Sequence, residues 1–315
     1  MQFKKPLFWD YKKPNLLSHI LLPLTIPVEI NNFLLNKKIK VKKNKIKTLC
    51  VGNIYLGGTG KTTTTISLYS MLKKMNKNIS IGKKFYSIQN DEHDLLKKNN
   101  LILGRTRNEI INKAINLKKK ILIFDDGLQD KYINYDLKFV CFDSIKWIGN
   151  GRLIPSGPLR EKLESLRKYD GIFLKGKEKE SVHIVKLIKK INPEIEIFNT
   201  KYEVLNSNKF DKNKNYLVFS GIGNSNDFRR ILIANKFKII KEIVYPDHYK
   251  YTNKDINNIN DVAKKMNAKI ITTEKDFVKV KMIDNKNINF LKINLKIKNE
   301  NKLYKFIKLK FNETN

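Results

Sequence analysis

A glycine-rich stretch after an apolar run is the first part of this sequence with a clear chemical use. Residues 51–64 read VGNIYLGGTGKTTT, and Lys61 and Thr62 directly follow Gly60. The backbone N–H groups of such a turn, with the positive end of a helix that starts there, bind phosphate oxygens. The lysine can reach the β- and γ-phosphates of a nucleotide, and the threonine hydroxyl can ligate Mg²⁺. The stretch therefore predicts a nucleotide-binding P-loop.

The predicted contacts with the nucleotide, which we expect to be ATP, run through this whole turn. The candidate ATP-binding residues are Tyr55, Leu56, Gly57, Gly58, Thr59, Gly60, Lys61, Thr62 and Thr63. The strict P-loop pattern has a glycine where this chain has Tyr55. The remaining glycines keep the space and the positive φ that close approach of a phosphate requires.

Two carboxylates at the end of an apolar run supply a candidate metal site. Residues 121–130 read ILIFDDGLQD, so Asp125 and Asp126 follow the apolar run directly. In P-loop proteins an acid at this place holds Mg²⁺, directly or through water. Without the upstream loop, two such aspartates would be ordinary helix caps or solvated turn residues. Together the two motifs predict Mg²⁺ bound by Thr62 and these acids.

A third stretch, residues 149–163 (GNGRLIPSGPLREKL), carries paired charges in a loop stiffened by prolines. Arg152 and Arg160 are candidates for substrate binding, because a guanidinium group binds phosphate in a planar, bidentate way. Glu161 is a further candidate metal ligand, and the sequence leaves open which of the acids touches the metal directly. Taken alone, the loop is equally compatible with a structural turn.

Apolar runs that alternate with helical patterns must position these motifs. Predicted strands and helices alternate from residue 46 to residue 174, and the pattern repeats from residue 216 to the last helix. Such alternation predicts a mainly parallel, doubly wound α/β sheet of the P-loop NTPase-like type, with a second, smaller α/β domain. The predicted domains are an N-terminal segment at 1–47, a P-loop nucleotide-binding domain at 48–205 and a smaller domain at 206–315 that closes over the cleft.

An apolar segment and a basic run are adjacent near the N-terminus. Residues 16–35 are about long enough to span a bilayer, but Pro23, Pro27 and Glu29 interrupt them. The run KKIKVKKNKIK follows at 37–47. An apolar helix beside a polybasic segment can lie in the interface of an anionic leaflet; the alternative is an ordinary amphipathic helix packed on the domain. We favour contact with an anionic membrane surface over a true span or a signal peptide.

Composition narrows the remaining classes of protein. There are 64 Lys and Arg against 30 Asp and Glu, a net charge of +34, which suits nucleic acid, an anionic membrane or a phosphorylated substrate. The positive charge is dispersed and no nucleic-acid-binding signature is present, so we expect no nucleic-acid partner. Cys50 and Cys141 lie in apolar runs, which indicates a reducing cytoplasm without a disulfide framework.

Six segments in order resemble the tetraacyldisaccharide 4′-kinase (lipid A 4′-kinase) family. They are VGNIYLGGTGKT, IFDDGLQD, GNGRLIPSGPLRE, SGIGNSNDF, YPDHYKYT and ITTEKDFVKV. The resemblance implies a lipid kinase that uses ATP and Mg²⁺ to phosphorylate the 4′-hydroxyl of a tetraacyldisaccharide 1-phosphate in lipid A biosynthesis. It also implies a peripheral or monotopic place at the cytoplasmic face of a Gram-negative inner membrane, with the glycolipid as partner; we expect a monomer.

The resemblance further implies the catalytic residues Asp91, His248 and Lys61. On its own, His248 would be read as a surface or cap residue. In similar proteins the histidine of its motif partners an aspartate after the second strand, and Asp91 is the matching candidate base. The chain departs from the family at Asp130, where a histidine is usual, and at 81–89, where lysines replace arginine in a shortened stretch.

A second class of function stays open from the sequence alone. A P-loop ATPase or GTPase acting as a switch or maturation factor would share the same loop and acids. It would hydrolyse nucleotide without a glycolipid, whereas a kinase needs its acceptor.

Overall fold

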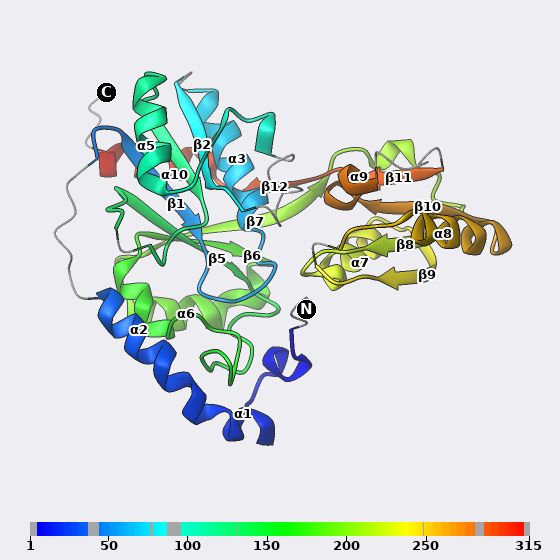
Figure 1. Cartoon of the computed structure of the whole chain (residues 1–315), viewed down its shortest axis with the longest axis horizontal. Helices are drawn as coiled ribbons and strands as arrows, with labels where there is room; N and C mark the ends of the chain where they lie inside the picture. Colours follow the sequence, from blue (N-terminus) through cyan, green and yellow to red (C-terminus); the bar gives the residue numbers. More distant parts are fainter. Residues whose placement is uncertain are drawn as a thin grey trace. The chain divides into compact units, whose positions relative to one another are not determined.

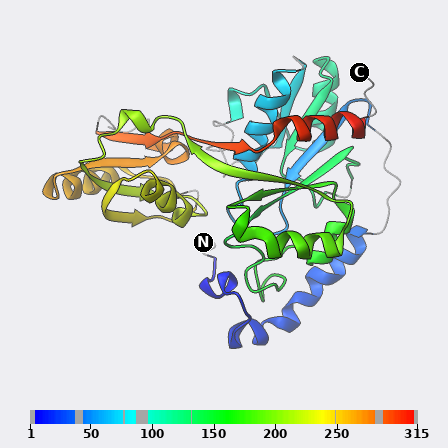
Figure 2. The same ribbon diagram turned by 180° about the vertical axis from the view of Figure 1, so that it is seen from behind.

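The computed structural model divides the chain into two compact units, and each is described by itself. The described residues are 5–36, 44–75, 78–86, 96–130, 132–247, 249–280 and 287–311. The larger unit comprises Phe3–Phe85, Lys98–Lys201 and Leu295–Asn315, and the smaller unit is built mainly from Tyr202–Asn294. Figures 1 and 2 show their elements from opposite sides.

The larger unit is built on an eight-stranded sheet in the order β12-β7-β6-β5-β1-β4-β2-β3. The pairs recorded from β3 to β7 are all parallel. The strands are β1 (Lys47–Gly52), β2 (Ile79–Lys84), β3 (Leu101–Gly104), β4 (Ile121–Asp125), β5 (Leu137–Asp143), β6 (Gly171–Lys175), β7 (Glu196–Val204) and β12 (Ile293–Ile297). The predicted doubly wound α/β fold is confirmed. Because parallel strands share one carboxyl edge, the ends of β1, β2 and β4 bring their following residues together.

Helices and apolar side chains cover this sheet. The helices are α3 (Lys61–Lys73), α5 (Arg107–Asn116), α6 (Val182–Ile191) and α10 (Glu300–Phe311). β4 is buried throughout and β1 is buried after its first residue, which is why both read as mainly apolar runs in the sequence. Phe306 of α10 packs against Phe139 and Phe198, with ring centroids 6.2 and 5.7 Å apart.

This aromatic packing explains where the structure departs from the predicted domain boundaries. The smaller domain was expected to include residues 206–315, yet β12 and α10 belong to the larger unit. Lys298 N donates to Asn199 O on β7 at 2.8 Å, and Phe306 fills space over the sheet. Their apolar surface is buried there, so the chain returns after the smaller unit.

The smaller unit has its own four-stranded sheet in the order β11-β10-β8-β9, and its recorded pairs are parallel. Its elements are β8 (Asn215–Ser220), α7 (Ser225–Ala234), β9 (Lys238–Val244), α8 (Asn253–Lys265), β10 (Ala268–Thr273), α9 (Glu274–Val280) and β11 (Ile288–Leu291). Thr252 and Asp255 form a capping box at the start of α8. The unit's two apolar clusters lie on opposite faces of the sheet. Leu217 belongs to one cluster and Val218 to the other, and successive side chains of a strand point to opposite faces.

The N-terminal apolar segment is broken into short helices. They are α1 (Leu16–Ile20), the 3₁₀ turn η2 (Leu22–Thr25) with a proline in its first turn, and α2 (Ile26–Asn36). Proline interrupts a single long helix because it lacks the N–H and fixes φ. None of the helices in the described part of the chain has the length and apolar character that a bilayer crossing requires.

Both cysteines lie in the sheet of the larger unit. Cys50 and Cys141 are at most 1% exposed, and burial raises the pKa of Cys141 to about 12. A thiol reacts with disulfide reagents as the thiolate, so both should be inert in the folded protein. We expect no thiol to be titrated by an aromatic disulfide reagent at pH 8, and both to react in denaturant. A thiol that reacted at once without denaturant would contradict this burial.

Candidate active site

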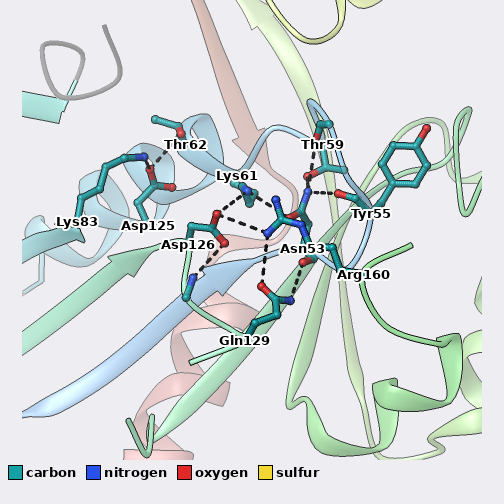
Figure 3. A network of polar contacts seen from close by, with 12 residues as sticks. Asn53, Tyr55, Thr59, Lys61, Thr62, Lys83, Asp125, Asp126, Gln129 and Arg160 are labelled. Carbon is teal, nitrogen blue, oxygen red and sulfur yellow. Dashed lines mark hydrogen bonds and ion pairs between the residues drawn. The ribbon is translucent and has the colours of Figure 1, made fainter. Parts of the chain in front are cut away.

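The phosphate loop connects β1 to α3 and is braced from inside by Asn53. Asn53 is fully buried, and its amide donates to Tyr55 O (2.5 Å) and Thr59 Oγ1 (3.0 Å) (Figure 3). Gly60, at the N-cap of α3, has φ 84°, a left-handed conformation that favours glycine. The loop therefore opens into a helix N-terminus, whose backbone N–H groups suit a phosphate.

Tyr55 stands where the strict pattern has glycine, and its ring lies beside Gly57, whose added Cβ would be 3.7 Å from Tyr55 Cε1. Its ring is buried against Leu153 and Leu159. Its hydroxyl is hydrogen bonded to Asp10 and to Lys5 of the N-terminal segment. The side chain is therefore engaged with that segment, and what Tyr55 gives to the phosphate loop is its carbonyl, which accepts from Asn53.

Lys61 is held at the mouth of the loop by an acid from the end of β4. Its Nζ lies 2.9 Å from Asp126 Oδ2 and 3.2 Å from Asn53 Oδ1. Burial alone would raise the pKa of Asp126, but the charges of Lys61 and Arg160 lower it well below its usual value. Asp126 is therefore ionised, and a phosphate can replace it as the partner of Lys61.

Asp125 lies one residue earlier and is fully buried. Thr62 Oγ1 donates to its Oδ2 at 3.1 Å, and Thr65 Oγ1 donates to its Oδ1 at 3.2 Å. Lys83, at the end of β2, places its Nζ 2.6 Å from the same Oδ2. Hydroxyl and carboxylate oxygens side by side are the donors that Mg²⁺ uses together with substrate phosphates. The oxygen set fits the metal, although no cluster of three or more His, Cys, Asp or Glu residues is found in the described ranges.

Glu161 belongs to a neighbouring polar chain. Its Oε1 accepts from Gln129 Nε2 at 2.8 Å, and both of its oxygens accept from Tyr169. Lys168 Nζ lies 2.6 Å from its Oε2. Both carboxylate oxygens are thus occupied by protein donors. Arg160 Nη1 contacts Gln129 Oε1 at 3.4 Å and lies 3.8 Å from Asp126, so polar contacts connect Glu161 to Asp126 through Gln129 and Arg160.

The turn after β4 is fixed by Arg107. Arg107 donates to Asp130 Oδ2 at 2.8 Å and to Asp126 O at 3.1 Å. Asp130, which stands where the resembling family has histidine, is therefore an ion-pair partner here. Asp126 and Gly127 have φ of 69° and 147°, so the turn depends on unusual backbone conformations that this pair stabilises.

Gly127→Ala should disturb this turn. A Cβ there would lie 2.5 Å from Arg107 Nε and 2.7 Å from Tyr135 Oη. We expect a loss of about 1–3 kcal/mol in the free energy of unfolding and weaker ATP binding, from strain together with the clash. Thermal melting and calorimetric titration with ATP measure both. Gly151→Ala is the matched control, since Gly151 also has positive φ (76°) but its Cβ would meet only Ile148 Cδ1, at 3.6 Å; equal losses in the two variants would contradict the role of the turn.

The structure brings most of the predicted residues together and separates one. Lys61, Thr62, Asp125, Asp126 and Arg160 converge at the carboxyl edge of the larger sheet (Figure 3). Arg152 lies elsewhere, with Nη2 3.3 Å from His19 Nδ1 on α1. The predicted catalytic residues Asp91 and His248 lie outside the described residues.

Five polar residues of the network were not among the predicted site residues. They are Asn53, Lys83, Arg107, Gln129 and Tyr169. Asn53 and Gln129 lie within the P-loop stretch and the ILIFDDGLQD stretch, so their positions in these motifs could have indicated a role in the site. Lys83 lies in the stretch 81–89, where lysines replace the arginine that is usual in the resembling family, whereas nothing in the sequence marks Arg107 or Tyr169.

Comparison with known proteins places the chain in a family. The family model for tetraacyldisaccharide-1-P 4′-kinase matches residues 17–98 and 90–312. A tetraacyldisaccharide 4′-kinase from Pelagibacter ubique is 46% identical over 316 residues, with 100% of both chains covered. The chain belongs to the tetraacyldisaccharide 4′-kinase family. A relative with the same name from Rickettsia bellii is 35% identical, covering 96% of this chain and 97% of that one.

A solved structure agrees with membership of the tetraacyldisaccharide 4′-kinase family. The crystal structure of LpxK from Aquifex aeolicus in complex with ATP has a TM-score of 0.70 and 25% identity, and it covers 94% of this chain and 100% of that one. The predicted enzyme class, an ATP-dependent kinase, is thereby confirmed. The alternative of a P-loop switch or maturation factor gains no support.

Proposed function

We propose that the protein transfers the γ-phosphate of ATP to the 4′-hydroxyl of a tetraacyldisaccharide 1-phosphate, with Mg²⁺ as the metal. The observation that carries this proposal is the convergence of Lys61, Thr62, Asp125, Asp126 and Arg160 beside a helix N-terminus. Positive groups, a pair of oxygens suited to a metal and the N-terminus of a helix meet at one edge of the sheet. This arrangement neutralises and positions phosphates, which supplies most of the catalysis in phosphoryl transfer.

The residues divide the work of the reaction among them. The bond between the γ-phosphorus and the ADP oxygen breaks, a bond to the 4′-oxygen forms, and the hydroxyl proton passes to a base. Loop N–H groups hold the phosphates while Lys61 exchanges Asp126 for a phosphate oxygen. Arg160, oriented by Gln129, is placed to bind the transferred group.

The metal would be held by Thr62 and Asp125, with Asp126 nearby. Bound Mg²⁺ supplies charge neutralisation across the β- and γ-phosphates. The contact of 3.1 Å between Thr62 Oγ1 and Asp125 Oδ2 supports this assignment, because the two oxygens lie close enough to bind the same cation. Gln129 and Tyr169 already donate to the carboxylate of Glu161, which favours a role in positioning these neighbours over direct binding of the metal.

Asp91 is our candidate for the base, with His248 orienting it. This assignment comes from the motifs that the chain shares with its family. Asp91→Asn should lower the turnover number and leave ATP affinity unchanged, because a base acts on the acceptor hydroxyl.

Mass spectrometry of a lipid A precursor incubated with protein and ATP tests the proposed function directly. We expect the mass of one added phosphate, located on the distal sugar by fragmentation. Incubation with ADP in place of ATP is the control and should add none. ATP hydrolysis that proceeds at the same rate without the glycolipid, with no phosphate on the sugar, would instead support a switch.

We also place the protein at a membrane surface, bound through its N-terminal segment. Nine apolar residues from α1 to α2 are 41–76% exposed, an unusual concentration for a soluble surface. They are Leu16, Leu17, Ile20, Leu22, Leu24, Ile26, Ile30, Phe33 and Leu34. These helices are tied to the larger unit, since Ser18 Oγ donates to Ser156 O at 2.6 Å and Asn32 Nδ2 donates to Arg160 O at 2.8 Å. The acceptor is a glycolipid, so binding at the cytoplasmic leaflet would bring the enzyme to it.

Replacing Leu24 and Ile30 together by glutamate should weaken vesicle binding. We expect the partition coefficient on vesicles containing anionic lipid to fall by about tenfold or more, because each apolar side chain loses its burial in the interface. Co-sedimentation with such vesicles measures it. The matched control replaces Ile233 and Leu309, exposed by 54% and 73% outside this segment. Equal weakening in the two double variants would contradict membrane contact through α1 and α2.

A further inference from the structure

A lysine occupies the place beside the proposed metal ligands. Lys83 Nζ lies 2.6 Å from Asp125 Oδ2, the same oxygen that accepts from Thr62 Oγ1. The side chains of the pair are 5% and 1% exposed. A unit positive charge of the protein is thus fixed on the carboxylate oxygen that a divalent cation would need (Figure 3).

The pairing of β2 with β4 brings Lys83 close to Asp125. Gly82 of β2 pairs with Phe124 of β4, so the next residues, Lys83 and Asp125, are lateral neighbours at the carboxyl edge. Lys83 approaches from the strand side, whereas Thr62 approaches from the start of α3. Asp125 therefore has its Oδ2 shared between an ammonium group and the P-loop hydroxyl, while Thr65 holds its Oδ1.

We propose that Lys83 is a positioning residue that competes with the divalent cation for Asp125. In the protein without nucleotide it holds the carboxylate toward Thr62 and keeps the affinity for a free cation low. The phosphates of ATP add the negative charge and oxygen ligands that overcome this competition, so the cation binds with the nucleotide. This inference rests on the proposed metal role of Thr62 and Asp125.

A second pair in the same sheet provides a matched control. Lys175, at the end of β6, lies 2.8 Å from Asp143 at the end of β5, and the side chains are 9% and 1% exposed. The two residues are in register on neighbouring parallel strands. This pair lies on the other side of β1 from β4 and β2. It shares the chemistry and burial of the first pair, and neither member bonds Thr62 in the hydrogen bonds that the structure gives that hydroxyl.

Mn²⁺ binding to the full-length protein without ATP tests the proposal. Free Mn²⁺ is measured by electron paramagnetic resonance for wild type, Lys83→Met and Lys175→Met. We expect Lys83→Met to bind Mn²⁺ about tenfold more tightly or more, since one charge about 5 Å from a dication has that effect even in water. Lys175→Met should bind as wild type does.

Stability must be followed alongside, because removing one partner of a buried ion pair is destabilising. If Lys83→Met does not fold, Lys83→Gln decides, because it keeps an amide donor for Asp125 without the charge. Lys83→Arg, which keeps the charge, should retain wild-type Mn²⁺ affinity.

The outcomes separate this inference from the proposed function. If wild type binds Mn²⁺ with ATP, but the folded variant lacking the charge binds Mn²⁺ without ATP no more tightly than wild type, the role of Lys83 is refuted. If Mn²⁺ binds to neither protein, with or without ATP, the metal role of Thr62 and Asp125 fails as well. Transfer of phosphate to the disaccharide is read independently by mass spectrometry.

Discussion

Lys61→Ala should lower kcat/KM for phosphate transfer to the disaccharide by about 10³-fold, the scale of losing a group that stabilises developing charge. Lys61 belongs to the P-loop itself, and its Nζ is hydrogen bonded to Asp126 and Asn53. Its loss leaves the β- and γ-phosphates without their main protein charge. Transfer of radiolabelled phosphate from ATP to the glycolipid measures the effect.

The control for this variant is Lys74→Ala. Lys74 is exposed at the C-terminal end of the same helix, α3, and should be replaceable without loss of activity. Both variants should retain the wild-type circular dichroism spectrum, because Lys61 is itself partly exposed. A folded Lys61→Ala protein that phosphorylated the disaccharide at near the wild-type rate would refute the proposed function.

Asp125→Ala should remove both activity and much of the stability of the larger unit. Its carboxylate neutralises the buried Lys83, and removing one partner of such a pair costs about 3–5 kcal/mol. In a unit of this size that corresponds to a melting temperature lower by about 10 °C. Differential scanning calorimetry gives the stability, and transfer of labelled phosphate gives the activity.

Asp126→Asn separates the two effects, because it removes the charge while asparagine tolerates the positive φ of 69° at this position. Asp126 also pairs with a lysine, but its side chain is 33% exposed, and a pair near solvent contributes about 1 kcal/mol or less. This variant should lose activity while it melts close to wild type. If the two variants had the same melting temperature, the buried pair of Lys83 and Asp125 would not contribute the stability assigned to it.

The parts of the site that the sequence predicts are those encoded locally. The turn from Gly57 to Thr62 needs glycine and a helix start, and both are visible in consecutive residues. Asp125 and Asp126, at the end of β4, could be placed because parallel strands end at a common edge. For the same reason the strands of the larger sheet were predictable from their continuous apolar runs.

The parts that escaped prediction depend on contacts between distant segments. Lys83 is one of 64 basic residues, and only the pairing of β2 with β4 puts it on Asp125. The partners of the Tyr55 hydroxyl, Asp10 and Lys5, come from the N-terminal segment, which the P-loop motif does not include. The engagement of Glu161 by Tyr169 likewise arises from folding of the loop after β5.

The return of the chain to the larger sheet has a consequence for biosynthesis. β12 is the edge strand beside β7, and α10 places Phe306 among Phe139 and Phe198, yet most of the smaller unit, Tyr202–Asn294, is translated between Phe198 and Phe306. A nascent polypeptide emerging from the ribosome can thus form most of the P-loop sheet early. The cluster of Phe139, Phe198 and Phe306 is complete only after residues 293–311 have been translated. During that interval the exposed rings and the open strand edge would be targets for chaperones.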